Sequence, residues 1–177
     1  MKEYLVLDLG CGRAKTTGSI GVDRSPETDA DVVADVDAKR LPFKDCTFSS
    51  VIMNDALEHV SNVGDTLAEI HRILKPGGEF RAQVPHFTSL HAFSDFTHRH
   101  FFSLEGVKRL AGDNERYGHY DVKGFRLKRA RLKMWKIWRL LGVELIANRF
   151  PQTYEKLFAF SFPSMFIEFC LTKEDKC

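Results

Sequence analysis

The stretch Tyr-Leu-Val-Leu-Asp-Leu-Gly-Cys-Gly, residues 4–12, decides the fold class of this 177-residue chain. Its apolar run is typical of a strand buried in a parallel sheet, and the run ends at Asp8 and two glycines. Gly10 and Gly12 carry no Cβ, so the backbone can turn sharply there and approach a ligand closely. Glycines at the carboxyl end of a parallel strand mark the usual nucleotide crevice of an open α/β sheet. We therefore expect a nucleotide-like ligand at this turn.

Two more short strands are expected at residues 19–22 and 31–34, and an aspartate follows each of them, Asp23 and Asp35. The carboxyl ends of parallel strands meet at one edge of a sheet, so these carboxylates should lie close to the glycine turn. Carboxylates accept hydrogen bonds. The pattern therefore predicts a ligand with ribose hydroxyls and an exocyclic amine.

Three further segments follow in order: Leu41-Pro42-Phe43, Leu57-Glu58-His59-Val60, and Glu-Ile-His-Arg-Ile-Leu-Lys-Pro-Gly-Gly at residues 69–78. With the strand ends above, they resemble the class I methyltransferases that use S-adenosylmethionine, and within these the small-molecule subgroup called methyltransferase type 11. The resemblance covers residues 4–112 and departs from the family pattern at Ala14 and Ser49. It implies a Rossmann-like α/β fold: a seven-stranded, mostly parallel sheet with helices on both faces and an antiparallel hairpin of the last two strands.

Apolar spacing predicts the remaining elements. We expect strands at residues 50–54, 79–84, 125–134 and 165–172, and helices at 63–74, 103–112 and 134–145. The first of these helices should be ended by Pro76 and the glycine pair behind it. Only six residues separate Gly12 from Ser19, too few for the usual crossover helix, so the first helix should be missing or reduced to a turn.

The resemblance also implies a cofactor site. The backbone of the Gly10-Cys11-Gly12 turn would meet the methionine part of S-adenosylmethionine. Asp23 would accept hydrogen bonds from both ribose hydroxyls, and Asp35 would accept one from the adenine amine. Asp37, two residues further on, is the alternative to Asp35. The remaining expected cofactor contacts are Asp8 at the glycine loop or the ammonium group, Lys15 in the loop over the site, Val36 at the adenine ring, and Asn54 and Asp55 near the transferred methyl group.

Residues 86–100 hold four of the seven histidines and should fall beside the transferred methyl group. A histidine that titrates near neutrality is the usual general base. The predicted catalytic residues are His98, Asp95, His86 and His100. A metal site is the rival use, but the spacings match no standard site and we assign no metal ligands. A third interpretation is that these histidines bond the backbone of a lid loop. Glu58 and His59 are expected to be structural and to cap the loop after the fourth strand, with the alternative that His59 reaches the acceptor.

Charge is unevenly distributed along the chain. Residues 1–122 carry 14 basic and 19 acidic side chains, a net charge of −5, whereas residues 123–177 carry 12 basic and 5 acidic ones, a net charge of +7. Trp135, Trp138, Leu141 and Leu145 could share one face of a basic amphipathic helix, which suits a peripheral contact with an anionic membrane. The alternatives are a solvated strand with a helix packed on the core, or nucleic acid, for which no RNA-binding module is present.

Composition fits one domain over residues 1–177: a cofactor-binding half at 1–85, a lid and acceptor region at 86–122, and basic edge strands with a helix at 123–177. The scattered cysteines predict reduced thiols, and the strand close to the N-terminus predicts no signal peptide, so we expect a cytoplasmic protein. The sequence does not indicate an oligomeric state.

These observations predict an S-adenosylmethionine-dependent methyltransferase that releases S-adenosylhomocysteine. Its acceptor would be a small molecule, lipid-linked and glycan-linked ones included. The alternatives are a non-catalytic cofactor-binding or regulatory protein, or a metal-binding lid with other chemistry.

Overall fold

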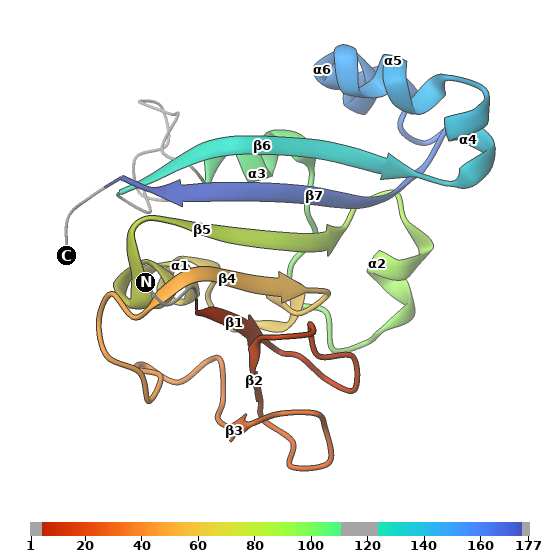
Figure 1. The fold of residues 1–177 in the computed structure, drawn as a ribbon. Coiled ribbons are helices and arrows are strands. Elements are labelled where there is room, and N and C mark those ends of the chain that lie inside the picture. Colours follow the sequence, from red (N-terminus) through yellow and green to blue (C-terminus); the bar gives the residue numbers. More distant parts are fainter. Residues whose placement is uncertain (1–4, 111–123, 175–177) are drawn as a thin grey trace.

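The computed structural model describes residues 5–110 and 124–174. They form one sheet with the strand order β3-β2-β1-β4-β5-β7-β6 (Figure 1). Strands β1 to β5 are parallel, and β7 runs antiparallel to both β5 and β6. The predicted sheet, with its antiparallel C-terminal pair, is thus confirmed. The strands are β1 (Val6–Leu9), β2 (Ile20–Asp23), β3 (Val32–Val33), β4 (Phe48–Asn54), β5 (Leu74–Pro85), β6 (Phe125–Met134) and β7 (Ser164–Lys173).

The central strands are apolar because both of their faces are covered. In β1 the side chains of Leu7 and Leu9 are fully buried, and in β4 so are Phe48, Val51 and Met53. This core fixes the register of the sheet, so the carboxyl ends of β1, β2 and β4 meet at one edge.

Helix α1 (Val63–Ile73) begins at Asn62, whose side chain accepts the N–H groups of Gly64 and Asp65. It buries Leu67, Ile70 and Ile73 against the sheet. The helix ends before Pro76, because Leu74 is already the first residue of β5 and pairs with Phe48 of β4. Residues 75–78, with Pro76 and the glycine pair, fall at a register shift inside β5. A shorter helix, η1 (Leu57–His59), precedes α1, and two others follow β5: α2 (Leu90–Ser94) and α3 (Leu104–Arg109), the last capped by Ser103 as expected.

The connection from β1 to β2 contains turns and no helix over residues 10–19. The N–H groups of Gly10 and Cys11 both donate to the carbonyl of Val22, at 2.8 and 3.2 Å. Strand β2 therefore holds the glycine turn directly, without a crossover helix.

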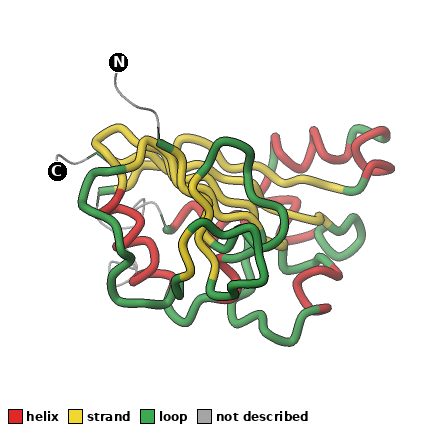
Figure 2. Tube along the Cα trace, turned by 60° about the horizontal axis from the view of Figure 1, so that its bottom comes forward, coloured by secondary structure: helices red, strands yellow, loops and turns green. Residues whose placement is uncertain are grey.

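Between β6 and β7 the chain forms four short helices, α4 (Lys136–Leu140), α5 (Val143–Arg149), α6 (Pro151–Thr153) and η3 (Tyr154–Phe158). We call residues 135–160 the C-terminal arm; its helices lie at one end of the molecule (Figure 1, Figure 2). The single helix expected at 134–145 is wrong, because Gly142 adopts a left-handed φ of 74° and breaks it. Trp138 packs against Phe162, whereas Leu141 and Leu145 are exposed, so the expected shared face is not formed.

Among the described residues, Cys11 and Cys170 are free thiols.

Within the described ranges, none of the helices has the length and apolar character needed to cross a bilayer.

Candidate cofactor and acceptor site

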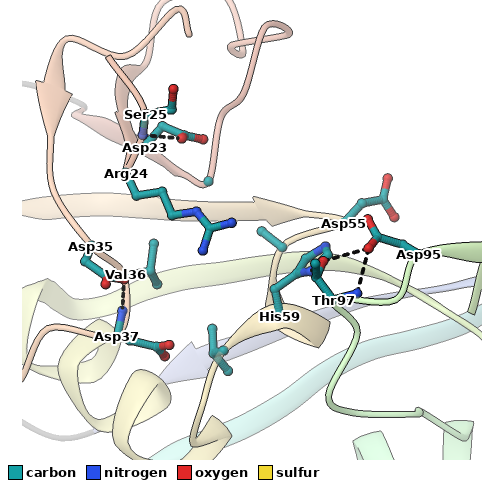
Figure 3. Close-up of a pocket in the computed structure, with 13 residues that line it drawn as sticks. Asp23, Arg24, Ser25, Asp35, Val36, Asp37, Asp55, His59, Asp95 and Thr97 are labelled. Carbon is teal, nitrogen blue, oxygen red and sulfur yellow. Dashed lines mark hydrogen bonds between the residues drawn. The ribbon is translucent and has the colours of Figure 1, made fainter. Parts of the chain in front are cut away.

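A cavity of about 410 Å³ lies at the carboxyl edge of the sheet, where the loops after β1, β2, β3 and β4 meet. Figure 3 shows Asp23 and Asp35 on one side of it, and His59, Asp95 and Thr97 on the other. The cavity is lined by Gly10, Asp23, Arg24, Ser25, Asp35, Val36, Asp37, Asp55, Ala56, His59, Val60, Asp95 and Thr97. Its wall carries five aspartates and one arginine, which favours a cationic ligand.

Gly10 is required by its surroundings. Its φ is +70°, and a Cβ at this position would lie 2.6 Å from the Cβ of Ala56. No other residue fits both the backbone conformation and the space. The glycine turn therefore presents bare backbone to the cavity.

Asp23 and Asp35 stand at the ends of neighbouring strands, and each holds the local backbone. The carboxylate of Asp23 accepts the N–H groups of Gly12 and Ser25, at 3.0 and 2.9 Å. Asp35 accepts the N–H of Asp37 through Oδ1 at 2.9 Å. A carboxylate can accept about four hydrogen bonds, so both residues keep capacity for a ligand.

Asp37, the rival of Asp35, is engaged elsewhere. Its two carboxylate oxygens accept the N–H and the hydroxyl of Ser61, at 2.7 and 2.8 Å. This pair ties the loop after β3 to the loop after η1. Asp35 is thus the freer of the two carboxylates.

Several other residues expected to contact the cofactor do not line the cavity. Buried Asp8 accepts the N–H of Thr16 at 2.7 Å and orients the loop. Burial, followed by the charges of Asp8 and Asp23, raises the pKa of the Cys11 thiol. Lys15 pairs with both oxygens of Asp31 at 2.9 Å. The described residues that line the cavity do not include Asp8, Cys11, Gly12, Lys15 or Asn54. The contact of these five residues with a cofactor stays a prediction.

Three of the four residues predicted to be catalytic are held by other groups. His86 is fully buried between Thr88, at 2.7 Å from Nδ1, and Glu155, at 3.2 Å from Nε2. Nδ1 of His98 lies 3.0 Å from the carbonyl of Ala92, and Nε2 of His100 lies 2.9 Å from that of Val60. None of these histidines is among the described residues that line the cavity, so their catalytic role stays a prediction.

Asp95 does face the cavity. The hydroxyl of Thr97 and then its N–H donate to this carboxylate, at 2.7 and 2.8 Å, and hold its pKa below the usual value. Thr97, which the sequence pattern did not indicate, and His59, expected to be structural or to reach the acceptor, both line the cavity. Nδ1 of His59 lies 2.9 Å from the Thr97 hydroxyl, and burial, then the neighbouring His98, lowers the pKa of the His59 imidazole. The available signal was the position of His59 just after β4.

Glu58 stands beside this group and is 1% exposed. Burial raises the pKa of its carboxyl group to about 7, and the charges of Asp55 and Asp95 add to that shift. A structural role was the expectation for Glu58, but its side-chain oxygens have no hydrogen-bond partner within the described part of the chain.

Comparisons with known proteins agree with this geometry. Residues 7–82 match the sequence model of the methyltransferase domain family. The ubiquinone/menaquinone biosynthesis C-methyltransferase UbiE of Desulfotalea psychrophila is 34% identical in an alignment 86 positions long that covers 47% of this chain and 35% of that protein. The human mitochondrial arginine-hydroxylase NDUFAF5 is 36% identical in an alignment 93 positions long that covers 43% of this chain and 27% of that protein. The chain therefore spans only about a third of the length of these curated relatives.

The fold recurs in solved structures. A SAM-dependent methyltransferase from Archaeoglobus fulgidus superposes with a TM-score of 0.67 over 97% of this chain and 87% of that one, at 20% sequence identity. At that identity the likeness concerns the fold. Residues 7–82 thus match the methyltransferase domain family, and the sheet has the fold of an S-adenosylmethionine-dependent methyltransferase; the match and the fold together imply S-adenosylmethionine as the cofactor.

Proposed function

We propose that this chain transfers a methyl group from S-adenosylmethionine to a small-molecule acceptor. The observation that carries the proposal is the acidic cavity at the carboxyl ends of β1 to β4, with the bare backbone of Gly10 in its wall. S-adenosylmethionine carries a sulfonium and an ammonium group, and carboxylates stabilise such charges. The residues present therefore fit this cofactor.

Each part of the wall has a task in this proposal. Asp23 would accept the ribose hydroxyls, since its carboxylate is already fixed by Gly12 and Ser25. Asp35 and Val36 would hold the adenine ring, and Asp55 lies at the end of β4 beside the acceptor side. The sulfonium supplies an activated methyl group, so the protein mainly has to orient the acceptor and exclude water.

Asp95 is the residue we assign to the acceptor. It lines the cavity, and the two hydrogen bonds from Thr97 keep it ionised. An ionised carboxylate at this place can take the proton that the acceptor atom loses as it is methylated. His86, His98 and His100 would instead position the segment that carries Asp95.

Calorimetry with S-adenosylhomocysteine, the expected product, tests the proposal directly. The purified chain should bind it at micromolar concentration or below and should bind adenosine more weakly, because adenosine lacks the ammonium group. Absence of binding would contradict the assignment of the cavity. Measurable affinity combined with no methyl transfer to any acceptor would favour a non-catalytic cofactor-binding protein.

We further propose that the acceptor is an apolar, membrane-borne molecule and that the C-terminal arm contacts the lipid surface. The arm exposes ten large apolar side chains: Trp135, Ile137, Leu140, Leu141, Leu145, Ile146, Phe150, Leu157, Phe158 and Phe160. So extensive an apolar surface marks a contact with a partner or a membrane. The name of the relative UbiE, a C-methyltransferase of ubiquinone and menaquinone biosynthesis, supports the same class of acceptor.

The cations for an anionic surface would come from the arm rather than from β6. On β6, Lys128 pairs with Glu79, and both Arg131 and Lys133 pair with Glu168. Much of the positive charge noted in the sequence is thus balanced within the sheet. Lys136, Arg139, Arg149 and Lys156 lie among the apolar side chains of the arm.

A further inference from the structure

We infer that Glu58, His59 and His98 form a binding site for one divalent transition-metal ion. One ligand atom from each of the three residues lies within 4.8 Å of the other two. Glu58 and His59 belong to η1, whereas His98 comes from the loop after α2. The fold therefore brings together a carboxylate and two imidazoles from separate segments. This inference concerns the metal alone and does not depend on methyl transfer.

The buried carboxylate of Glu58 has no hydrogen-bond partner among the described residues, and a bound cation would be its partner. The residue is 1% exposed, and neither carboxylate oxygen has a hydrogen-bond partner among the described residues. Buried polar groups are nearly always hydrogen-bonded, and a buried carboxylate without a partner is costly. Nε2 of His98 lies 3.8 Å from Oε1 of Glu58, too far for a hydrogen bond but suited to two ligands around one ion.

The two imidazoles each make, through Nδ1, a hydrogen bond of the kind that metal-binding histidines usually make through their second nitrogen. Nδ1 of His98 faces the carbonyl of Ala92 at 3.0 Å; a carbonyl only accepts, so Nδ1 carries the proton and Nε2 keeps its lone pair. The hydroxyl of Thr97 donates to Asp95, so it accepts from Nδ1 of His59 and leaves that Nε2 unprotonated as well. Metal-binding histidines characteristically donate their other N–H to a carbonyl or towards a carboxylate, which fixes ring and tautomer.

The ligand set selects the ion. Two imidazoles and one carboxylate suit Zn²⁺ or Fe²⁺, whereas Mg²⁺ and Ca²⁺ prefer oxygen ligands. Donor atoms at about 2.0–2.2 Å from a tetrahedral ion lie about 3.4 Å apart, so closing the present spacing needs movements of about 1 Å. His59 also lines the cavity, so a fourth coordination position would open onto it.

Titration of the chelator-treated 177-residue chain with Zn²⁺ alone, followed by calorimetry, tests the site. We expect about one equivalent to bind in the wild type, Mg²⁺ at the same concentration not to bind, and Co²⁺ to give the visible absorption of a nitrogen- and oxygen-ligated ion. Glu58→Gln and His98→Ala should each weaken Zn²⁺ binding by at least about tenfold. Glu58→Gln removes a buried charge, so its folding is expected to be intact and circular dichroism checks it.

His91→Phe is the matched control. His91 lies in the same region but stacks on Phe166 at 5.2 Å and is not part of the cluster, so the phenylalanine keeps the stacking and Zn²⁺ affinity should not change. Zn²⁺ should also raise the melting temperature of the wild type and of His91→Phe, but not that of Glu58→Gln. Failure of the wild type to bind Zn²⁺, or equal affinity in the wild type and Glu58→Gln, would overturn the inference.

Discussion

The imidazole of His86 and the carboxylate of Glu155 lie 3.2 Å apart although 69 residues separate them along the chain. Glu155 also accepts the N–H groups of Leu104 and Glu105 at the start of α3, at 2.5 and 3.2 Å. One carboxylate in the C-terminal arm therefore joins the end of β5, the start of α3 and the arm itself. His86 is a structural partner in this arrangement.

The Glu155 contacts predict a pH-dependent stability. Burial opposes ionisation, but the bonds from His86, Leu104 and Glu105 outweigh it and lower the pKa below its usual value of 4.5. A lowered pKa in the folded state contributes stability above about pH 4.5, and this contribution is lost as the pH falls through the folded value. Glu155→Gln should therefore cost about 1–3 kcal/mol of unfolding free energy at neutral pH and less at acid pH, as measured by urea denaturation.

Glu105→Gln is the control for that measurement. Its side chain is 38% exposed and lies 3.7 Å from Arg109, so it should change stability by less than about 0.5 kcal/mol at either pH. A cost for Glu155→Gln that is equal at both pH values would contradict the ionic account.

Arg72 predicts a second stability effect. It donates to both oxygens of Glu69, at 2.7 and 2.5 Å, and reaches the carbonyl of Phe43 and the carboxylate of Asp45. Glu69 in turn accepts the N–H of Leu41 at 2.6 Å, so the pair fixes the loop before β4 to α1. Arg72→Ala should cost about 2–3 kcal/mol of unfolding free energy in chemical denaturation, because it leaves buried Glu69 without its partner.

The exposed pair between Arg40 and the same Asp45 offers a comparison. The Arg40 side chain is 68% exposed, and Arg40→Ala should cost less than about 1 kcal/mol. Equal losses for Arg40→Ala and Arg72→Ala would show that burial does not decide the strength of these pairs.

Asp23 gives the sharpest test of the cofactor site. Asp23→Ala should weaken binding of S-adenosylhomocysteine by about 1.5–3 kcal/mol, or roughly 10- to 150-fold, the range for hydrogen bonds to a charged group. Calorimetry measures this directly. Asp65→Ala, at an exposed carboxylate in the first turn of α1, should leave the affinity unchanged. A similar loss in both variants would point to a general charge effect.

The exposed apolar side chains of the arm predict binding to vesicles. Leu140 and Leu145 are 75% and 77% exposed, and replacing both with glutamate should reduce co-sedimentation with anionic vesicles by at least about tenfold. Binding should fall as salt rises, because each cation near the surface contributes about 1 kcal/mol that salt screens. Arg131→Gln, which alters an ion pair within the sheet, should bind as the wild type does. Unchanged binding by the double variant would remove the arm from the interaction.

The sheet and one wall of the site could be predicted because strand ends follow from the sequence pattern. Apolar runs that end in Gly10, Asp23 and Asp35 must bring those residues to one edge if the strands are parallel. Gly142 shows the limit of such patterns: the apolar spacing from Trp135 continues across it, but its left-handed backbone divides the predicted helix.

The histidines could not be placed from sequence for a different reason. The orientation of a loop side chain depends on partners far away in the chain, as His86 depends on Glu155 and His98 on the carbonyl of Ala92. The cluster of Glu58 with His98 likewise joins residues whose spacing matches no standard metal motif. Only the packed structure shows which nitrogen of each ring is free.

The absence of a side chain at Gly10 allows the glycine turn to pack against the segment that begins η1. Because a Cβ there would lie 2.6 Å from the Cβ of Ala56, the glycine turn packs closely against the residue just before η1, the short helix that carries Glu58 and His59. The substitution Gly10→Ala would place a methyl group against Ala56 and displace the start of that helix. It would therefore perturb both halves of the cavity at once and would not test the nucleotide end alone.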